Sequence, residues 1–345
     1  MTSPTSFLDN LDPPARELLL SAATPISFVA GSTLVRHGEL ARGAYVLRAG
    51  AVEAEVTQPG GEKLVVAKLG PGSVFGEMAL IELGTCTATV RATRSVDGWF
   101  VSNEDFRAIV SQRSAAAIHL QHAVTTMLAG KVAALNAQLL DCTAPEDRPA
   151  RPFAPGVDPL AGVPRLRRPS FDAAAFLPRL PFFDHFSSDE VDEIASCGSY
   201  VEVPRGQAIF ALGGPPTSAF LVVRGAAEIL HAKSGCERRM AVLGPGQLIG
   251  YLAILNERSH GAHALARESS LLLDIPAKAF REIYLGDRAV STRLRAAVQK
   301  SLLASMARTN RALTRLLSQA RLDAATKEGR TLEAAYAAQL TATAD

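Results

Sequence analysis

The chain has 345 residues, which is long for one domain and comfortable for two, so we expect two compact cores. Its 36 lysines and arginines nearly balance 34 acidic residues, and the formal charge of +2 gives no global field that favours nucleic acid or a membrane. The N-terminus lacks the basic start and apolar stretch of a signal peptide, and no apolar run approaches the roughly 20 residues of a membrane span. A cytoplasmic location is therefore expected.

The residues that carry chemistry are scattered along the chain. The four cysteines have no spacing that suits zinc or a redox pair, and the seven histidines do not cluster with carboxylates. We find no nucleophile–base pair, carboxylate dyad, kinase motif or cyclase motif. The sequence therefore predicts neither a metal site nor catalytic residues, and the protein is not expected to be an enzyme.

The first third of the chain alternates between short apolar stretches and breaks. Segments such as AYVLRAGAVEAEVT and KLVVAKLG are separated by glycine, proline and Asn/Asp-type breaks about every 8 to 12 residues, which is typical of a small antiparallel barrel or jelly roll. A helical stretch follows from Asn103 to about Leu140. Its apolar side carries Ile118, Val124, Leu128, Val132, Leu135 and Leu139.

A proline-rich segment, residues 141–171, has no sustained periodicity and is interpreted as a linker of extended, surface-running chain. It contains RRPSF, in which two arginines precede Ser170, so a basophilic kinase is one possible modifier of Ser170. Chance is the competing explanation for so short a motif.

The second half repeats the first with a shift of about 175 positions. Gly31 and Gly38 fall on Gly206 and Gly213, and LGPGSVFG falls on LGPGQLIG with a one-residue adjustment. The second copy also ends in a helical stretch, from Ala277 to about Leu322. We therefore expect a mainly β fold with flanking helices, in which one jelly-roll domain occurs twice.

The last helical stretch, Arg288 to Ala325, has two features with open alternatives. One is a seam with alternating spacings of four and three that is apolar except for one threonine, formed by Leu302, Met306, Thr309, Leu313, Leu316 and Ala320. This seam favours either a homodimer or a helix packed on its own barrel. The basic residues are Arg288, Arg293, Arg295, Lys300, Arg308, Arg311, Arg315 and Arg321. They indicate either a solvated helix face, which is favoured, or a surface for nucleic acid phosphates.

The segment GPGSVFGEMALIELGTCTATVRA resembles the phosphate-binding cassette of cyclic nucleotide-binding domains, as found in catabolite activator proteins and regulatory subunits of the cAMP-dependent kinase. The resemblance covers both repeats and implies two β-roll (jelly-roll) domains, each followed by helices. No helix-turn-helix follows the second domain in the sequence given. The implied boundaries are 1–140 for the first domain, 141–171 for the linker, 172–285 for the second domain, and 286–345 for the C-terminal helix and tail.

In the first cassette, a sharp turn at Gly76 would lead into a short helix whose free amides form an anion site. The resemblance implies that Glu77 accepts a hydrogen bond from the ribose 2′-hydroxyl, whereas the alternative is a carboxylate that caps the helix. Cys86 stands where the family has the arginine that pairs with the cyclic phosphate, and an arginine elsewhere, such as Arg91, is one substitute. The implied ligand-binding residues are Phe75, Gly76, Glu77, Met78, Ala79, Cys86, Thr87 and Ala88.

The second cassette departs further from the family. Tyr251 replaces the glutamate and His260 replaces the arginine. His260 would pair with a phosphate only in its protonated form, so a surviving site would weaken as pH rises. Arg258, two residues before His260, is a second candidate cation. The more favoured interpretation is that Tyr251 fills the pocket. The corresponding residues are Gly250, Tyr251, Leu252, Ala253, His260 and Gly261.

These observations predict a cytoplasmic regulatory protein that binds a cyclic nucleotide (cAMP, cGMP or cyclic di-GMP) weakly or in its first domain only, and acts on a partner protein. One alternative is a ligand-free assembly protein that uses the degenerate fold as a scaffold. A second is a transcriptional regulator that contacts DNA through the basic C-terminal helix, although the lack of a helix-turn-helix makes DNA unlikely.

Overall fold

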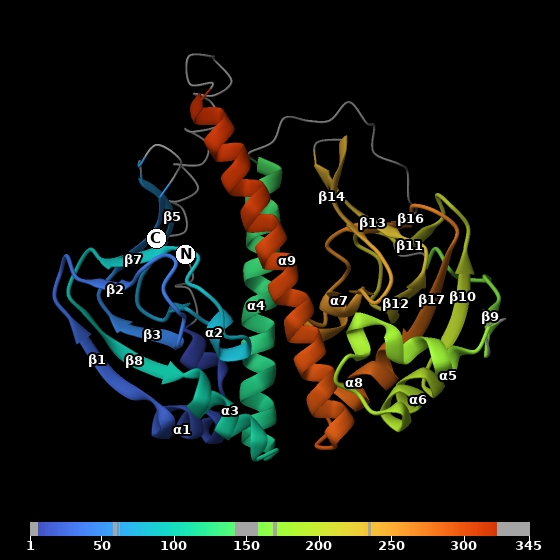
Figure 1. The fold of residues 1–345 in the computed structure, drawn as a ribbon, viewed down its shortest axis with the longest axis horizontal. Helices are drawn as coiled ribbons and strands as arrows, with labels where there is room; N and C mark the ends of the chain where they lie inside the picture. The colour runs from blue at the N-terminus through green and yellow to red at the C-terminus, as the bar shows by residue number, and fades with distance from the viewer. Residues whose placement is uncertain are drawn as a thin grey trace. The chain divides into compact units, whose positions relative to one another are not determined.

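The computed structural model describes residues 6–57, 61, 63–141, 158–167, 171–233 and 236–322 (Figure 1). Internal contacts divide the chain into two units: Met1–Leu128 with Asn310–Asp345, and Ala129–Thr309. Each unit contains one β-roll, so the expected duplication is confirmed.

The first β-roll consists of two antiparallel sheets of four strands, in the orders β1-β8-β3-β6 and β2-β7-β4-β5. Its strands are β1 Thr24–Phe28, β2 Thr33–Val35, β3 Gly43–Ala49, β4 Val52–Thr57, β5 Lys63–Leu69, β6 Val74–Phe75, β7 Thr89–Ala92 and β8 Val96–Ser102. The two-residue period of a strand determines which side chains face inward. In β7, for example, Val90 and Ala92 join the core while Arg91 points to the opposite face of the sheet.

The second β-roll repeats this topology and adds one edge strand, with sheet orders β15-β12-β17-β10-β9 and β11-β16-β13-β14. Its strands are β9 Arg165–Leu166, β10 Ser199–Val203, β11 Ala208–Phe210, β12 Ser218–Arg224, β13 Ala227–Lys233, β14 Cys236–Leu243, β15 Leu248–Ile249, β16 His263–Ala266 and β17 Ser270–Pro276. The registers match between the copies: Tyr45 lies opposite Phe100, and Phe220 lies opposite Asp274. Asp274 therefore occupies the position of Phe100.

Helices flank each β-roll, as the sequence predicts. The first unit has η1 Phe7–Asn10, α1 Pro13–Ala22, α2 Met78–Ile81 and α3 Asn103–Ser111, followed by α4 Ala115–Asp141. The second has α5 Ala173–Phe176, η2 Leu177–Arg179, η3 Pro181–Phe183, α6 Ser188–Ser196, α7 Tyr251–Leu255 and α8 Ala277–Leu285, followed by α9 Ala289–Leu322. The boundary between the units falls inside both long helices, after Leu128 in α4 and after Thr309 in α9. Both long helical stretches are interrupted. Arg113, with φ of 52°, lies between α3 and α4, and Gly286 lies between α8 and α9.

Part of the segment that composition assigns to the linker is packed on the second β-roll. Residues 165 and 166 form β9, which pairs with β10, and Leu160 is fully buried in the core. Residues 142–157 and 168–170, which include the candidate phosphorylation site Ser170, lie outside the described residues.

Helix α4 corrects the expectation that no segment is long and apolar enough to cross a membrane. By length and composition alone, Ala115–Leu140 meets that description. Its residues Leu120, Val124, Leu128 and Val132 are buried within the chain, as are the polar Gln121 and Thr125. Core helices of soluble proteins pass the same test, so this one helix is weak evidence for a membrane span.

The apolar seam of α9 is buried within the chain itself, at Leu302, Met306 and Leu313, whereas Leu316 is partly exposed. Inside the second unit, the Thr309 hydroxyl of α9 donates to Asn136 Oδ1 of α4 at 2.9 Å. These contacts favour intramolecular packing of the helix over a homodimer seam.

Basic residues near the start of α9 are also used internally. Arg288 pairs with Glu193 at 2.6 Å, and Arg293 pairs with Glu190, both on α6. The Arg295 side chain is 1% exposed and donates to the carbonyls of Tyr284 and Gly286. These contacts give the three arginines roles within the second domain and do not support the alternative of a stripe for nucleic acid phosphates.

Candidate functional site

Both cassettes begin with a glycine that no other residue could replace without strain. Gly76 has φ of +75°, and a Cβ there would lie 2.6 Å from the Gly43 carbonyl oxygen. Gly250 has φ of +79°, and its Cβ would lie 2.9 Å from the Ser218 carbonyl oxygen. Because only glycine adopts this conformation readily, the two positions set the same turn from a short strand into a short helix.

The short helix α2 is held in place by a side chain that the sequence analysis did not identify. Asn103, 6% exposed at the start of α3, donates from Nδ2 to the carbonyls of Ala79 at 2.5 Å and Leu80 at 3.1 Å. These carbonyls belong to the end of α2, where helix acceptors lack internal partners. The cassette is thereby connected directly to the helical segment that leads into α4.

Glu77 is buried at the start of α2, with 5% of its surface exposed. Its backbone lies in the right-handed helical region, and its side chain makes no capping hydrogen bond to α2. The alternative interpretation of Glu77 as a helix-capping carboxylate is therefore wrong. Met78 is partly exposed and Ala79 is buried, so a small side chain follows Glu77 on the inner side of the helix.

Cys86 is partly exposed and forms no disulfide. Its amide donates to the Glu39 carbonyl at 2.8 Å, and its carbonyl accepts from Gly38. Burial, and then the nearby Glu39 carboxylate, raise the pKa of the Cys86 thiol, so the thiol is neutral at pH 7. Burial and the neighbouring thiol likewise raise the pKa of Tyr45. At the position that the resemblance assigns to the arginine, a neutral thiol thus lies near the Glu39 carboxylate and the Tyr45 phenol.

The remaining first-cassette residues lie on both sides of the roll. Thr87 is exposed, and Ala88 is partly buried against the core. Phe75 is buried in the core, and its ring stacks on Tyr45 with centroids 4.8 Å apart. Arg91, considered as a substitute cation, points away from the core and pairs through Nε with Glu55 at 3.5 Å. Its side chain therefore serves the outer face of the sheet.

In the second cassette, the position of the family's glutamate is filled by a buried phenol. Tyr251 is 5% exposed and begins α7, and burial raises its pKa. Ala253 is buried, Leu252 is partly exposed and Gly261 is exposed. A neutral hydroxyl thus stands at the position that the sequence resemblance assigns to the ribose-binding carboxylate.

His260 lies flat against Phe210, with ring centroids 4.0 Å apart and planes 12° from parallel. It is 5% exposed, and burial lowers its pKa to about 4, although a hydrogen bond to the Pro215 carbonyl and the charge of Asp158 oppose this shift. The imidazole is therefore neutral at pH 7. The expected pairing of protonated His260 with a phosphate is incompatible with this state near neutral pH.

The interiors of the two β-rolls differ in exposure at matching positions. Tyr45 and Val35 are only partly buried against the first core, whereas their counterparts Phe220 and Phe210 are 2% and 8% exposed. The first roll is therefore open to solvent at positions where the second is packed with aromatic rings.

The two β-rolls, each with a glycine-led short helix and trailing helices, define a tandem of cyclic nucleotide-binding folds. The chain belongs to the cyclic nucleotide-binding domain family, which matches residues 25–113 and 200–287. This confirms the resemblance and the fold expected from the sequence.

Two relatives illustrate the similarity. Over 106 residues the chain is 35% identical to the cyclic AMP receptor protein of Thermus thermophilus, covering 30% of this chain and 47% of that protein. Over 264 residues it is 24% identical to the cAMP-dependent protein kinase regulatory subunit of Mycosarcoma maydis, covering 73% of this chain and 40% of that protein. The matches thus span less than half of each relative.

Among solved structures, the regulatory domain of Toxoplasma gondii PKA in complex with cAMP aligns with 88% of this chain and 92% of its own, at 21% identity and a TM-score of 0.32. By their names, the relatives from Thermus thermophilus and Mycosarcoma maydis are a receptor protein and a regulatory subunit.

Proposed function

We propose that this protein is a regulatory protein whose first domain binds a cyclic nucleotide weakly and transmits its occupancy to a partner protein. The observation that carries the proposal is the contrast between the two cassettes. The first retains a buried carboxylate, Glu77, beside a partly exposed interior. The second has a buried Tyr251 at the position of Glu77, and its His260 is buried as well. The named relatives are a cyclic AMP receptor and a cAMP-dependent kinase regulatory subunit, which supports this ligand class.

The low affinity expected for a cyclic nucleotide follows from Cys86. A charge-assisted hydrogen bond contributes roughly 1.5 to 3 kcal/mol, so its loss lowers affinity by about 10- to 100-fold. A neutral thiol beside Glu39 does not supply that interaction. Transmission would run from α2 through Asn103 to α3 and α4, because Asn103 is bonded to the end of the cassette helix.

Calorimetry on the full chain with cAMP, cGMP and cyclic di-GMP tests the sensing function. We expect binding that Glu77→Gln abolishes and that Glu82→Gln, the same change at an exposed position at the end of α2, leaves intact. Absence of binding to the unaltered protein at high micromolar ligand would reject it.

A second candidate function is a ligand-free scaffold for protein assembly, which the neutral Cys86 site beside Glu39 favours. Glu77→Gln also distinguishes the scaffold from the sensing function. If Glu77→Gln leaves partner capture unchanged with and without nucleotide, the scaffold is supported. A transcriptional role through α9 gains no support, since Arg288, Arg293 and Arg295 are engaged within the second domain.

A further inference from the structure

A short segment that precedes the second domain in sequence, residues 158–166, folds onto the interior of the second β-roll; we call it the strap. Leu160 is fully buried in the core cluster that contains Phe210, Phe220 and Ile249. Val163 packs against the same cluster. The Gln207 side chain donates from Nε2 to the Pro159 carbonyl at 3.0 Å, which holds the strap beside β11.

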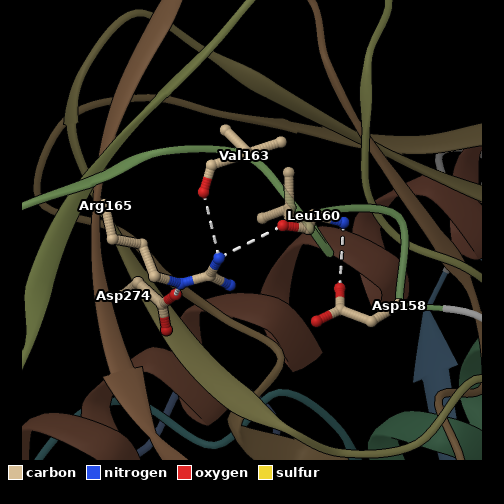
Figure 2. Close-up of polar contacts among 5 residues, drawn as sticks. All are labelled: Asp158, Leu160, Val163, Arg165 and Asp274. Carbon is tan, nitrogen blue, oxygen red and sulfur yellow. Dashed lines mark hydrogen bonds and ion pairs between the residues drawn. The ribbon is translucent and has the colours of Figure 1, made fainter.

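The strap has a defined shape of its own. Asp158 Oδ1 accepts from the Leu160 amide at 2.9 Å, and the Val163 amide donates to the Leu160 carbonyl at 3.1 Å. Figure 2 shows how the Arg165 guanidinium reaches back over this turn: Nη1 donates to the carbonyls of Leu160 at 3.1 Å and Val163 at 3.2 Å. One arginine thus holds the turn that presents Leu160 to the core.

The same arginine fastens the strap to the β-roll. Arg165 Nε donates to Asp274 Oδ2 at 2.9 Å, and the Asp274 side chain is only 3% exposed (Figure 2). Asp274 lies on β17, which pairs with strands on both sides. A buried carboxylate in a sheet is costly unless a cation pairs with it, so Asp274 is a receptor group that requires Arg165.

The first β-roll provides an internal comparison. The position of Asp274 is held there by Phe100, whose ring packs against Tyr45. The described core cluster of the first roll is built from residues between Phe28 and Val96, all within the roll itself. The second roll therefore gains both an additional apolar residue from outside its strands and a charged group that holds it.

We propose that the strap is an intramolecular ligand of the second β-roll. Leu160 is its apolar anchor, Arg165 and Asp274 form its latch, and its occupancy closes the interior of this domain to small molecules. The proposal goes beyond the proposed function and is independent of it, because it concerns the second domain whether or not the first binds a nucleotide.

The test uses the full chain and the dye 8-anilinonaphthalene-1-sulfonate, which fluoresces on exposed apolar surface. We expect Arg165→Gln and Leu160→Asp to raise the fluorescence several-fold at unchanged helix and strand content. The matched control is Arg167→Gln, the same substitution at an exposed arginine two residues further on, which should not raise it. A synthetic peptide of residues 158–167 should reverse the increase in the Arg165→Gln protein, and the peptide carrying Leu160→Asp should not.

Equal fluorescence in Arg165→Gln and the unaltered chain would overturn the proposal, as would a rise that the peptide does not reverse. If Leu160→Asp does not fold, hydrogen exchange on the unaltered protein decides instead. We expect the Leu160 and Val163 amides, which donate to Asp158 and to Leu160, to be protected relative to the free peptide. Exchange at the rate of the free peptide would reject the strap as a bound element.

Discussion

The imidazole of His260 stacks on the ring of Phe210, at a centroid distance of 4.0 Å. The sequence resemblance assigns the family's phosphate-binding arginine to the position of His260. A residue type that could have kept part of the arginine's role is used instead as an aromatic packing group. Near neutral pH, the second cassette therefore contains a neutral His260 and a buried Tyr251.

This packing predicts an acid-sensitive second domain. The folded-state pKa of His260, about 4, lies below the unfolded value of about 6.5, so below pH 6.5 the unfolded chain takes up a proton that the folded chain does not. The free energy of unfolding is therefore highest above pH 6.5 and falls as pH falls toward 4, by about 3 kcal/mol at most. His231, whose pKa burial also lowers, contributes with the same sign.

Urea unfolding between pH 7.5 and pH 4.5 measures this effect. His260→Gln should make the free energy of unfolding less dependent on pH. His185→Gln, at an exposed position in the same unit, should leave the pH dependence unchanged. If the slope of the free energy of unfolding against pH is the same in His260→Gln and the unaltered protein, the buried, neutral state of the imidazole is contradicted.

Cys86→Arg should strengthen cyclic nucleotide binding by the first domain. The substitution restores a cation at the end of the cassette, and we expect affinity for cAMP or cGMP to rise about 10- to 100-fold. Affinity for adenosine, which has no phosphate, should stay the same. The control is Cys197→Arg, at the free cysteine beside α6. An equal rise for adenosine and cAMP in calorimetry would show that the arginine does not act through the phosphate.

Leu302→Ala should lower the stability of the chain, because Leu302 is fully buried. Large-to-small changes at such sites cost about 2 to 5 kcal/mol. The exposed Lys300→Ala on the same helix is the control. Urea unfolding combined with light scattering distinguishes the two interpretations of the seam: loss of a dimer at unchanged stability would instead support a homodimer.

The fold could be predicted because its determinants are local and occur twice. Glycines recur at the same turns in both copies, and Gly76 and Gly250 have nearly equal positive φ values. Strand alternation is a local determinant of the same kind, and in β7 it turns Val90 and Ala92 toward the core. The cassette positions follow from the same repeat, and the structure brings Glu77 and Cys86 to the same roll.

The parts that could not be predicted depend on contacts between distant segments. Proline content indicates an extended linker, but burial of Leu160 and the bond between Arg165 and Asp274, 109 residues apart, are tertiary. One signal was present: the apolar strand SLLLDIP contains a single carboxylate where the first copy has Phe100. A charge in such a strand predicts a buried partner, although the sequence does not say which arginine supplies it.

Asn103→Ala should separate ligand binding from its transmission. The substitution removes both hydrogen bonds to the carbonyls at the end of α2, and we expect the first domain to lose about 1 to 3 kcal/mol of stability. Arg107→Ala, at an exposed position on α3, is the control. In hydrogen exchange with cAMP, α2 should still gain protection while the gain in α3 and the start of α4 is lost. Equal ligand-induced protection of α3 in both variants would exclude Asn103 as the connection, because the cassette would then reach the helices by another route.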